Sequence, residues 1–348
     1  HTAFLLLSVI AIAIIEGFRK GPFIRTAQYY FAFALIIYAL IWAIYGFRFH
    51  SASPSYSPLY WDRFASSGFM PLFDFLRGIK FLPEAYLYSV AGVLTGAGSG
   101  KAAFLMGRYS VEGWWYYFPV AFLIKTPIPV IILLIASLLF IPKKSGLKEV
   151  FLYIIFPAAL VFIIMSMQKV NIGIRHILPV YPFIFTLIGF APNIRTQSRR
   201  LAAAIFYGCV IWYIYSAASI FPHDLAYFNE FIGGPKNGYK YLVDSNLDWG
   251  QDLAGVKEYM DAKKIDRIKL AYFGLSDPRY FHIDYDYLPS FIIIDPQNVK
   301  AEVPLKGYFA VSATMLQGVY LPDRDFYKIF RDSQPIDTIG YSIFIYRF

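Results

Sequence analysis

The segment 114–141 reads WWYYFPVAFLIKTPIPVIILLIASLLFI, and it decides the fold class. Four aromatic residues stand before a long apolar run, which is the order expected where a helix enters a bilayer from the headgroup level. About 20 apolar residues are needed to cross the hydrocarbon core, and this run is long enough. Lys125 interrupts the run, and Pro127 and Pro129 follow at once. The segment therefore predicts a membrane-spanning helix that is broken close to a charged side chain.

Similar apolar runs recur up to about residue 220, and beyond it the chain has the composition of soluble sequence. Only 16% of the residues are charged, against about 25% in globular chains. We expect spans at 27–47, 115–141, 150–167, 177–191 and 201–220. A further run, 2–15, reaches only about 21 Å at 1.5 Å per residue. The sequence is thus expected to start inside a helix. The predicted fold class is a polytopic α-helical membrane protein, with about six spans here and a C-terminal α/β domain on the outer face.

Basic clusters set the expected orientation, because Lys and Arg accumulate in cytoplasmic loops. Clusters follow the apolar runs 2–15, 115–141 and 177–191. They are, in that order, Arg19, Lys20 and Arg25; Lys143, Lys144 and Lys148; and Arg195, Arg199 and Arg200. All three lie on one side if each run crosses once. The prediction is a multi-pass protein of the cell membrane, with a transmembrane helical region at 1–220, an outer segment at 48–113 and an extracytoplasmic α/β domain at 221–348.

The C-terminal region alternates between strand and helix patterns. Strands are expected at 239–243, 267–273, 291–294, 308–312 and 338–346, and helices at 251–264 and 323–330. This alternation favours a small, mostly parallel α/β layer. It contains no Gly-rich phosphate-binding fingerprint. In the outer segment, Pro83 is placed to open a short helix.

Lys125 is the first candidate site residue, because an ammonium group within a span is expected to face a cavity or an anionic partner. The alternative is that its long side chain reaches up to the outer surface. Arg175 and His176 are expected at the outer end of the span at 177–191. An arginine fork suits phosphate and a histidine can share a proton near neutrality, although both residues could instead anchor the helix at the headgroups. Together these residues predict a basic pocket for a lipid phosphate at the outer leaflet.

Asp244, Asp248 and Asp252 form an acidic loop in DSNLDWGQD that resembles a calcium loop, so a divalent cation is one reading. However, the glycine comes one position late, and Gly255 stands where the closing glutamate of an EF-hand would be. The alternative is that Asp248 or Gly250 caps the following helix, with Asp252 favouring its positive end.

Glu84 and Tyr86 are expected to be exposed on the outer segment, where they could contact an acceptor or simply be solvated. Cys209, the single cysteine, is expected to be a small buried apolar residue without a disulfide. The sequence shows no metal-binding cluster of His and Cys, no Ser-His-Asp arrangement and no defined cofactor site. The basic residues do not form a stripe with interleaved aromatics, which argues against nucleic acid as a partner.

Four segments resemble glycosyltransferase family 39, the group related to protein O-mannosyltransferases and lipid-A aminoarabinose transferases. They are GRYSVEGWWYYFPVAFLIKTPIP at 107–129, RHILPVYP at 175–182, LVDSNLDWGQDL at 242–253 and IGYSIFIY at 339–346. The resemblance covers most of the chain from about residue 81 onward. It implies a GT-C type fold that transfers a sugar, with inversion, from a polyprenyl-phosphate donor to an acceptor on the outer face. The implied partners are membrane lipid, the lipid-linked sugar and an acceptor that the sequence does not identify.

The resemblance also implies roles for particular residues. Lys125 and Arg175 fit binding of the donor phosphate. The family's catalytic acidic residues lie in the first outer loop, and no position here matches them, so they are expected upstream of His1. Two other classes stay open: a transporter or flippase of lipid-linked sugar, and a non-catalytic membrane anchor. A transporter would show paired, inverted helix interruptions, and only one clear interruption is present.

Overall fold

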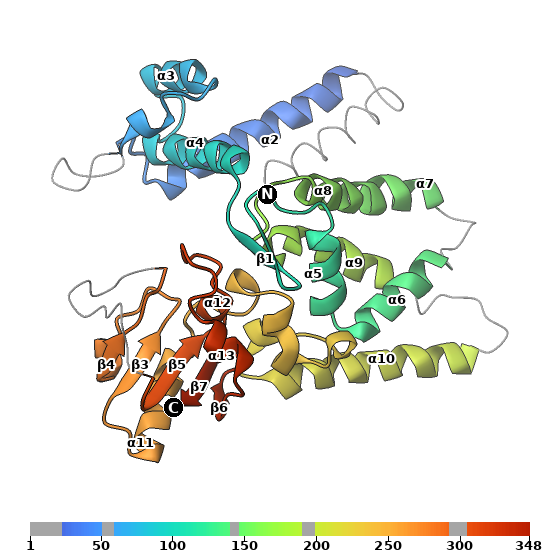
Figure 1. Cartoon of the computed structure of the whole chain (residues 1–348). Coiled ribbons are helices and arrows are strands. Elements are labelled where there is room, and N and C mark those ends of the chain that lie inside the picture. The colour runs from blue at the N-terminus through green and yellow to red at the C-terminus, as the bar shows by residue number, and fades with distance from the viewer. Residues whose placement is uncertain (1–22, 51–58, 140–145, 190–198, 292–304) are drawn as a thin grey trace. The chain divides into compact units, whose positions relative to one another are not determined.

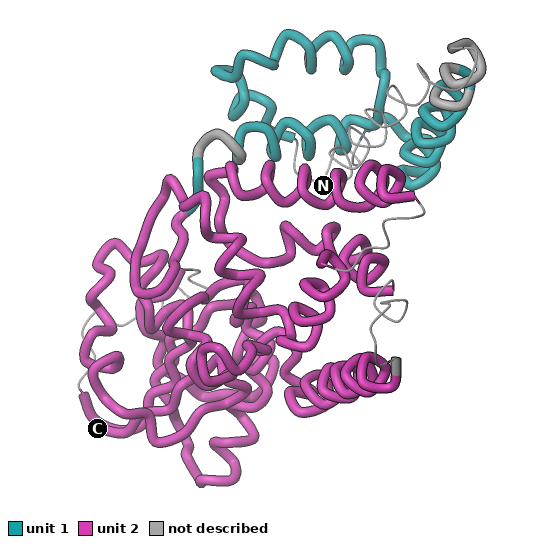
Figure 2. Tube along the Cα trace, turned by 90° about the vertical axis from the view of Figure 1, so that its right-hand side faces the viewer, with its two compact units in different colours: residues 1–101 teal, residues 102–348 magenta. Residues whose placement is uncertain are grey.

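The computed structural model (Figure 1) describes residues 23–50, 59–139, 146–189, 199–291 and 305–348. Contacts divide the chain into two compact units, 1–101 and 102–348, which Figure 2 shows in different colours. Several expectations fall outside the described residues. These are the apolar run 2–15, most of the strand at 291–294, and the basic residues Arg19, Lys20, Lys143, Lys144 and Arg195.

The first unit is helical. Its elements are α2 (Phe23–Ile44), the 3-10 helix η1 (Trp61–Phe64), α3 (Met70–Gly78) and α4 (Glu84–Ser99). Pro83 directly precedes α4, so the expected helix start is confirmed, although the helix is longer than a short interfacial segment. The unit has a small apolar core that includes Phe64, Phe73 and Leu87.

The second unit begins with a hairpin and continues with helices. Strands β1 (Ala103–Leu105) and β2 (Arg108–Ser110) pair antiparallel around Met106 and Gly107, both of which have positive φ. The helices are α5 (Tyr117–Lys125), α6 (Ile128–Leu139), α7 (Leu147–Val150), the π-helical turn η2 (Phe151–Ile155), α8 (Phe156–Ser166), the 3-10 helix η3 (Ile174–Val180), α9 (Tyr181–Ile188) and α10 (Arg199–Ile220).

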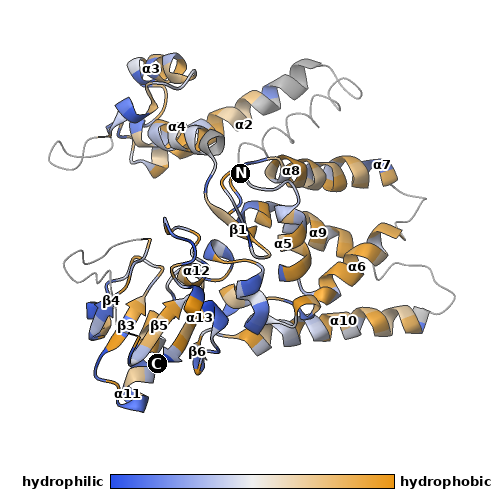
Figure 3. Ribbon diagram, in the orientation of Figure 1, coloured by the Kyte–Doolittle hydropathy of each residue, from blue (hydrophilic) through white to orange (hydrophobic). Residues whose placement is uncertain are grey.

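Two helices are long and apolar enough to cross a membrane, Leu147–Ser166 and Arg200–Ile220, and their apolar character is evident in Figure 3. A third crossing results only if α5 and α6, which are bent by 111° at Thr126 and Pro127, count as one broken span. The described residues thus contain two or three candidate spans, against the about six predicted. The protein is mostly helical, and these helices indicate membrane association.

Part of the difference from the predicted number has a physical cause. The expected span at 177–191 begins as a 3-10 helix with Pro179 inside it, and α9 adds only eight residues. The expected span at 27–47 falls on α2, where the side chains of most of the first eight residues lie outside the described residues and only Phe31–Ile44 counts as an apolar helix.

The C-terminal part of the second unit carries a five-stranded sheet in the order β4-β3-β5-β7-β6 (Figure 1). The strands are β3 (Ile268–Ala271), β4 (Tyr285–Tyr287), β5 (Tyr308–Ser312), β6 (Asp337–Ile339) and β7 (Ile343–Arg347). Strand β3 lies parallel to β4 and β5, whereas β7 lies antiparallel to β5 and β6. The sheet is therefore mixed, and the expectation of a mostly parallel sheet is wrong. Helix α11 (Leu253–Lys263) packs its apolar side on this sheet.

The local predictions for this region had mixed success. The strands expected at 267–273 and 308–312 and the helix at 251–264 are confirmed. Residues 239–243 do not form a strand; the first two are the end of the 3-10 helix η7 (Pro235–Lys240), and the rest follow it. The last expected strand is a hairpin of β6 and β7, turned at Gly340 and Tyr341, which both have positive φ. The helix expected at 323–330 is reduced to α13 (Lys328–Asp332).

Candidate functional site

Asn246 joins the segments that the sequence singles out. Its side chain is fully buried, and its Nδ2 donates to the Tyr117 hydroxyl at 2.8 Å. Its Oδ1 accepts from the backbone N–H of Ile174 at 2.9 Å, and its backbone carbonyl accepts from the Lys125 ammonium group. The acidic loop, the broken helix and the segment of Arg175 therefore meet at one side chain.

Lys125, at the end of α5, turns into the protein. Its Nζ donates to the Leu225 carbonyl at 2.7 Å and to the Asn246 carbonyl, and it lies 4.4 Å from the centroid of the Phe228 ring. No carboxylate pairs with this ammonium group in the part of the chain that the structure describes. The side chain thus binds carbonyl groups and an aromatic face, and its positive charge is not neutralised by these contacts.

The break after Lys125 leaves helix carbonyls without helical partners, as expected from the two prolines. Asn229 satisfies them. Its Nδ2 donates to the carbonyls of Leu123 at 2.6 Å and Thr126 at 2.8 Å. Its backbone N–H donates to the carbonyl of Ile124 at 2.9 Å. Asn229 could not be predicted as a site residue, because nothing in the sequence around it distinguishes it from an ordinary turn residue.

Arg175 and His176 contact different parts of the second unit. The Arg175 side chain is exposed, and its guanidinium carbon lies 5.4 Å from the centroid of the Trp249 ring. Among the described residues it has no carboxylate within ion-pair distance. The half-buried His176 ring packs 6.0 Å from the ring of Phe118 in α5. The structure thus brings Arg175 to the acidic loop and His176 to the broken helix.

Close approach of these segments depends on Gly173. A Cβ atom at this position would lie 2.7 Å from the Cβ of Ser245, closer than non-bonded carbon atoms come. The glycine lets the segment before Arg175 pack directly against the acidic loop.

The three aspartates of the acidic loop do not converge. The Asp244 carboxylate accepts from the Ser245 hydroxyl at 2.8 Å and from the Tyr320 hydroxyl. Asp248 accepts from the backbone N–H groups of Gly250 at 3.2 Å and Thr314 at 3.3 Å.

Asp252 accepts from the Ser342 hydroxyl at 2.6 Å, and its other oxygen lies 3.2 Å from His223 Nδ1. Because each carboxylate has its own protein donors, the loop does not have the geometry of a calcium loop. In the described residues, no three His, Cys, Asp or Glu side chains come together as metal ligands.

The expectation that Asp248 or Gly250 caps the following helix is wrong, although Asp252 does lie at the start of that helix, as expected. Helix α11 begins at Leu253, and Asp252 precedes it without a side-chain capping bond. Asp248 lies too far before the start of α11 to cap it, and its carboxylate accepts from the Gly250 N–H within its own loop. Burial raises the pKa of Asp248 to about 7, against the effect of its hydrogen bonds. Burial also raises the pKa of Asp252, although the Ser342 hydroxyl and His223 act in the opposite direction.

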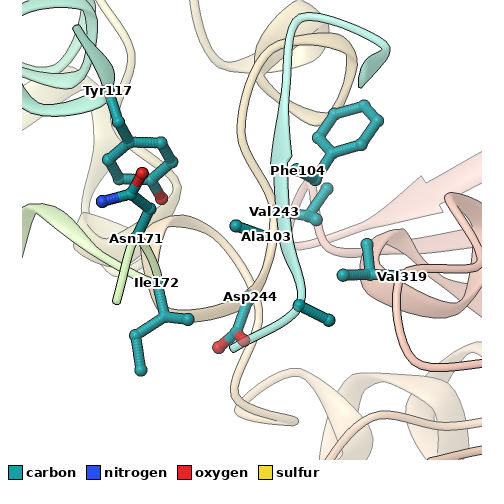
Figure 4. A pocket seen from close by; sticks show the side chains of 9 residues that line it. Ala103, Phe104, Tyr117, Asn171, Ile172, Val243, Asp244 and Val319 are labelled. Atoms are coloured by element: carbon teal, nitrogen blue, oxygen red, sulfur yellow. The ribbon is translucent and has the colours of Figure 1, made fainter. Parts of the chain in front are cut away.

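A narrow crevice of about 180 Å³ lies beside this loop (Figure 4). Asp244, Asn171 and Tyr117 contribute its polar lining, and the rest is Ala102, Ala103, Phe104, Ile172, Val243 and Val319. The empty space is divided too finely to hold a water molecule. The crevice is therefore not a ligand-sized cavity.

Glu84 and Tyr86 lie in the first unit. The Glu84 carboxylate is only 16% exposed; it accepts from the Trp61 indole at 3.2 Å and forms ion pairs with Arg77 at 3.3 Å and His50 at 3.6 Å. The expectation of an exposed Glu84 is thus wrong, because neighbouring donors draw the carboxylate inward. The half-buried Tyr86 packs edge-on against Tyr45, with ring centroids 6.4 Å apart.

The fold and the site together define a class: a mostly helical, membrane-associated chain whose broken helix is fastened to a C-terminal sheet by one buried loop. Comparison with protein-family models, with curated proteins and with solved structures found no match to this chain.

Proposed function

We propose that this chain is part of a membrane glycosyltransferase that transfers a sugar from a polyprenyl-phosphate donor to an acceptor on the outer face. In this proposal the helical region crosses the membrane about six times and the sheet lies outside. The support is that the four segments resembling family 39 are joined by hydrogen bonds. Asn246 of 242–253 binds 107–129 and the segment entering 175–182, and Asp252 binds Ser342 of 339–346.

Arg175 is the residue best placed to bind the donor phosphate. It is exposed, and its planar fork matches phosphate oxygens. Lys125 would act from within, because its ammonium holds the loop through Asn246 and adds positive charge that the described residues do not neutralise. His176 would support the same region by packing on α5.

The binding step is tested with bare polyprenyl phosphate and the full-length protein in proteoliposomes. Charge-assisted hydrogen bonds contribute about 1.5–3 kcal/mol, so Arg175→Gln should weaken binding roughly 10-fold or more. Arg279→Gln is the matched control, because Arg279 is an exposed arginine paired with Asp277 in the sheet region. Equal affinity of wild type and Arg175→Gln would overturn the assignment of Arg175.

The transfer step is tested with a radiolabelled hexosyl polyprenyl phosphate and membranes that supply candidate acceptors. Label in a product that no longer extracts with the donor lipid supports the transferase. Label that only changes leaflet supports the transporter instead. A protein that neither binds nor moves the donor fits the non-catalytic anchor.

A further inference from the structure

Four aromatic rings form a cluster in the second unit. The rings of Phe273 and Tyr320 stack in parallel, with centroids 5.7 Å apart and an interplanar angle of 2°. Trp249 lies 6.0 Å from Phe273, and Phe291 lies 4.4 Å from Tyr320. The acidic loop and the segments that follow β3, β4 and α12 (Ala313–Leu316) therefore contribute to a single aromatic cluster.

The cluster has a buried base and exposed flanks. Phe273 is buried, whereas 45% of Trp249 and 51% of Phe291 are exposed. A purely structural cluster would be expected to bury its largest rings, because burial of aromatic area is what stabilises it. Neighbouring exposed rings of this kind mark interaction surfaces.

A polar group borders these rings. The Arg175 guanidinium group, which can only donate hydrogen bonds, lies over Trp249. The Asp244 carboxylate is buried and already accepts from Tyr320 and Ser245, so it is not part of the exposed surface. The surface therefore offers an apolar plane beside a hydrogen-bond donor.

This combination suits a sugar ring better than a hydrocarbon. A pyranose presents an apolar face of C–H groups and a rim of hydroxyl groups that both donate and accept. An aromatic ring can stack on the face while Arg175 binds the rim. A prenyl chain would cover the Arg175 guanidinium group without pairing it, and this loss of solvation is unfavourable.

We propose that Trp249, Phe291 and the Phe273–Tyr320 pair, bordered by Arg175, form a binding surface for a hexopyranose ring. This inference goes beyond the proposed function, because it would hold for a carbohydrate-binding protein without transferase activity. The ring can belong to a lipid-linked sugar or to a free glycan.

The test is saturation-transfer NMR on the full chain in lipid nanodiscs, since alkyl glucoside detergents would compete. The probes are methyl hexopyranosides of glucose, galactose and mannose. At least one should receive magnetisation at its ring C–H protons, and Trp249→Ala should reduce this at least fivefold. Trp249→Phe keeps an aromatic ring and should retain part of the signal, which separates lost stacking from misfolding. Trp115→Ala removes an indole that is 73% exposed elsewhere, and it should have no effect.

Competition then shows whether the bound sugar ring belongs to a lipid-linked sugar or to a free glycan. Displacement by hexosyl polyprenyl phosphate but not by bare polyprenyl phosphate assigns the surface to the lipid-linked sugar. No displacement by either lipid assigns it to a free glycan. The inference is overturned if no glycoside binds or if Trp249→Ala binds as wild type does. None of these results depends on whether transfer occurs.

Discussion

Asn246 shows how much of the candidate site depends on a single side chain. One amide binds the broken helix through Tyr117 and the Arg175 segment through Ile174, and its backbone carbonyl receives Lys125. In the sequence it stands within an acidic loop, where an amide looks like one more oxygen ligand for a cation. Its true role depends on residues more than 70 positions away, which no local pattern reveals.

Replacement of Asn246 by alanine should destabilise the second unit. The Ile174 N–H and the Tyr117 hydroxyl would lose their partners, and each buried polar group left unsatisfied costs about 1–3 kcal/mol. We expect a fall of about 2–4 kcal/mol in the free energy of unfolding, measured by thermal or denaturant unfolding in detergent. Asn237→Ala is the control, because the partners of the Asn237 amide among the described residues, Ile232 and Lys240, lie near its own turn. If the two variants lost the same free energy of unfolding, Asn246 would not be the residue that connects these segments.

Asp248 predicts a pH dependence of stability. Its pKa is about 7 in the folded protein, well above the roughly 3.9 of an unperturbed aspartate, because burial disfavours the carboxylate. Between these two pH values the folded state binds a proton that the unfolded state has released. The contribution of Asp248 therefore falls as pH rises through this window, by up to about 1.4 kcal/mol per pH unit, and becomes constant above pH 7.

Asp248→Asn should remove this dependence, since asparagine resembles the protonated acid. The measurement is the midpoint of thermal unfolding of both proteins from pH 5 to pH 8. The variant should lose less stability than wild type over this range. Parallel curves for the two proteins would show that Asp248 titrates at a similar pH in the folded and unfolded states.

At the scale of elements, strong periodic patterns predicted structure well. Helix α11 and strands β3 and β5 were predicted within a few residues, because apolar side chains alternate or recur at helical spacing there. The pattern at 239–243 is similar, but Tyr241 and Leu242 are held by bonds to Gly238 and complete a turn instead. Strand β4 was missed, because three residues are too few for any periodicity to be visible.

The helix break between α5 and α6 could be predicted, but its angle could not. Two prolines indicate an interruption, whereas the bend of 111° depends on Asn229, which binds the freed carbonyls from a segment about 100 residues later. A bend this large is compatible with a broken span and also with a re-entrant loop.

Cysteine labelling distinguishes these two arrangements. In a Cys209→Ala background, single cysteines replace Trp115 before α5 and Leu139 at the end of α6, both of which are exposed. A broken span predicts that a membrane-impermeant maleimide labels the first in intact cells and the second only after permeabilisation. Asp332→Cys, on exposed α13, should be labelled in intact cells if the sheet lies outside. Labelling of both helix positions in intact cells would show that the segment is re-entrant.

At the scale of the whole molecule, the boundary expected near residue 221 separates regions that the structure joins. The contacts place the later helices and the sheet in one compact unit, 102–348. The segment after α10 is what connects them, since Phe228 lies under Lys125, and Leu242 and Leu247 are fully buried. Composition changes near residue 221, where the candidate span Arg200–Ile220 ends, but packing does not.

This continuity predicts how fragments behave. A fragment of 221–348 would lose α5, so that Asn229 and Asn246 would no longer have their partners and Phe228 would face water. Burying a side chain of this size contributes about 1.5–3 kcal/mol, which is a large share of the 5–15 kcal/mol of a typical domain. We expect 221–348 to bind a hydrophobic dye and to aggregate, whereas 102–348 in detergent should be monodisperse and unfold in one cooperative step. A soluble 221–348 fragment that unfolds at the same temperature as the sheet in the longer protein would show that the sheet is an independent domain. The loop around Asn246 would then be a docking contact and not part of a shared core.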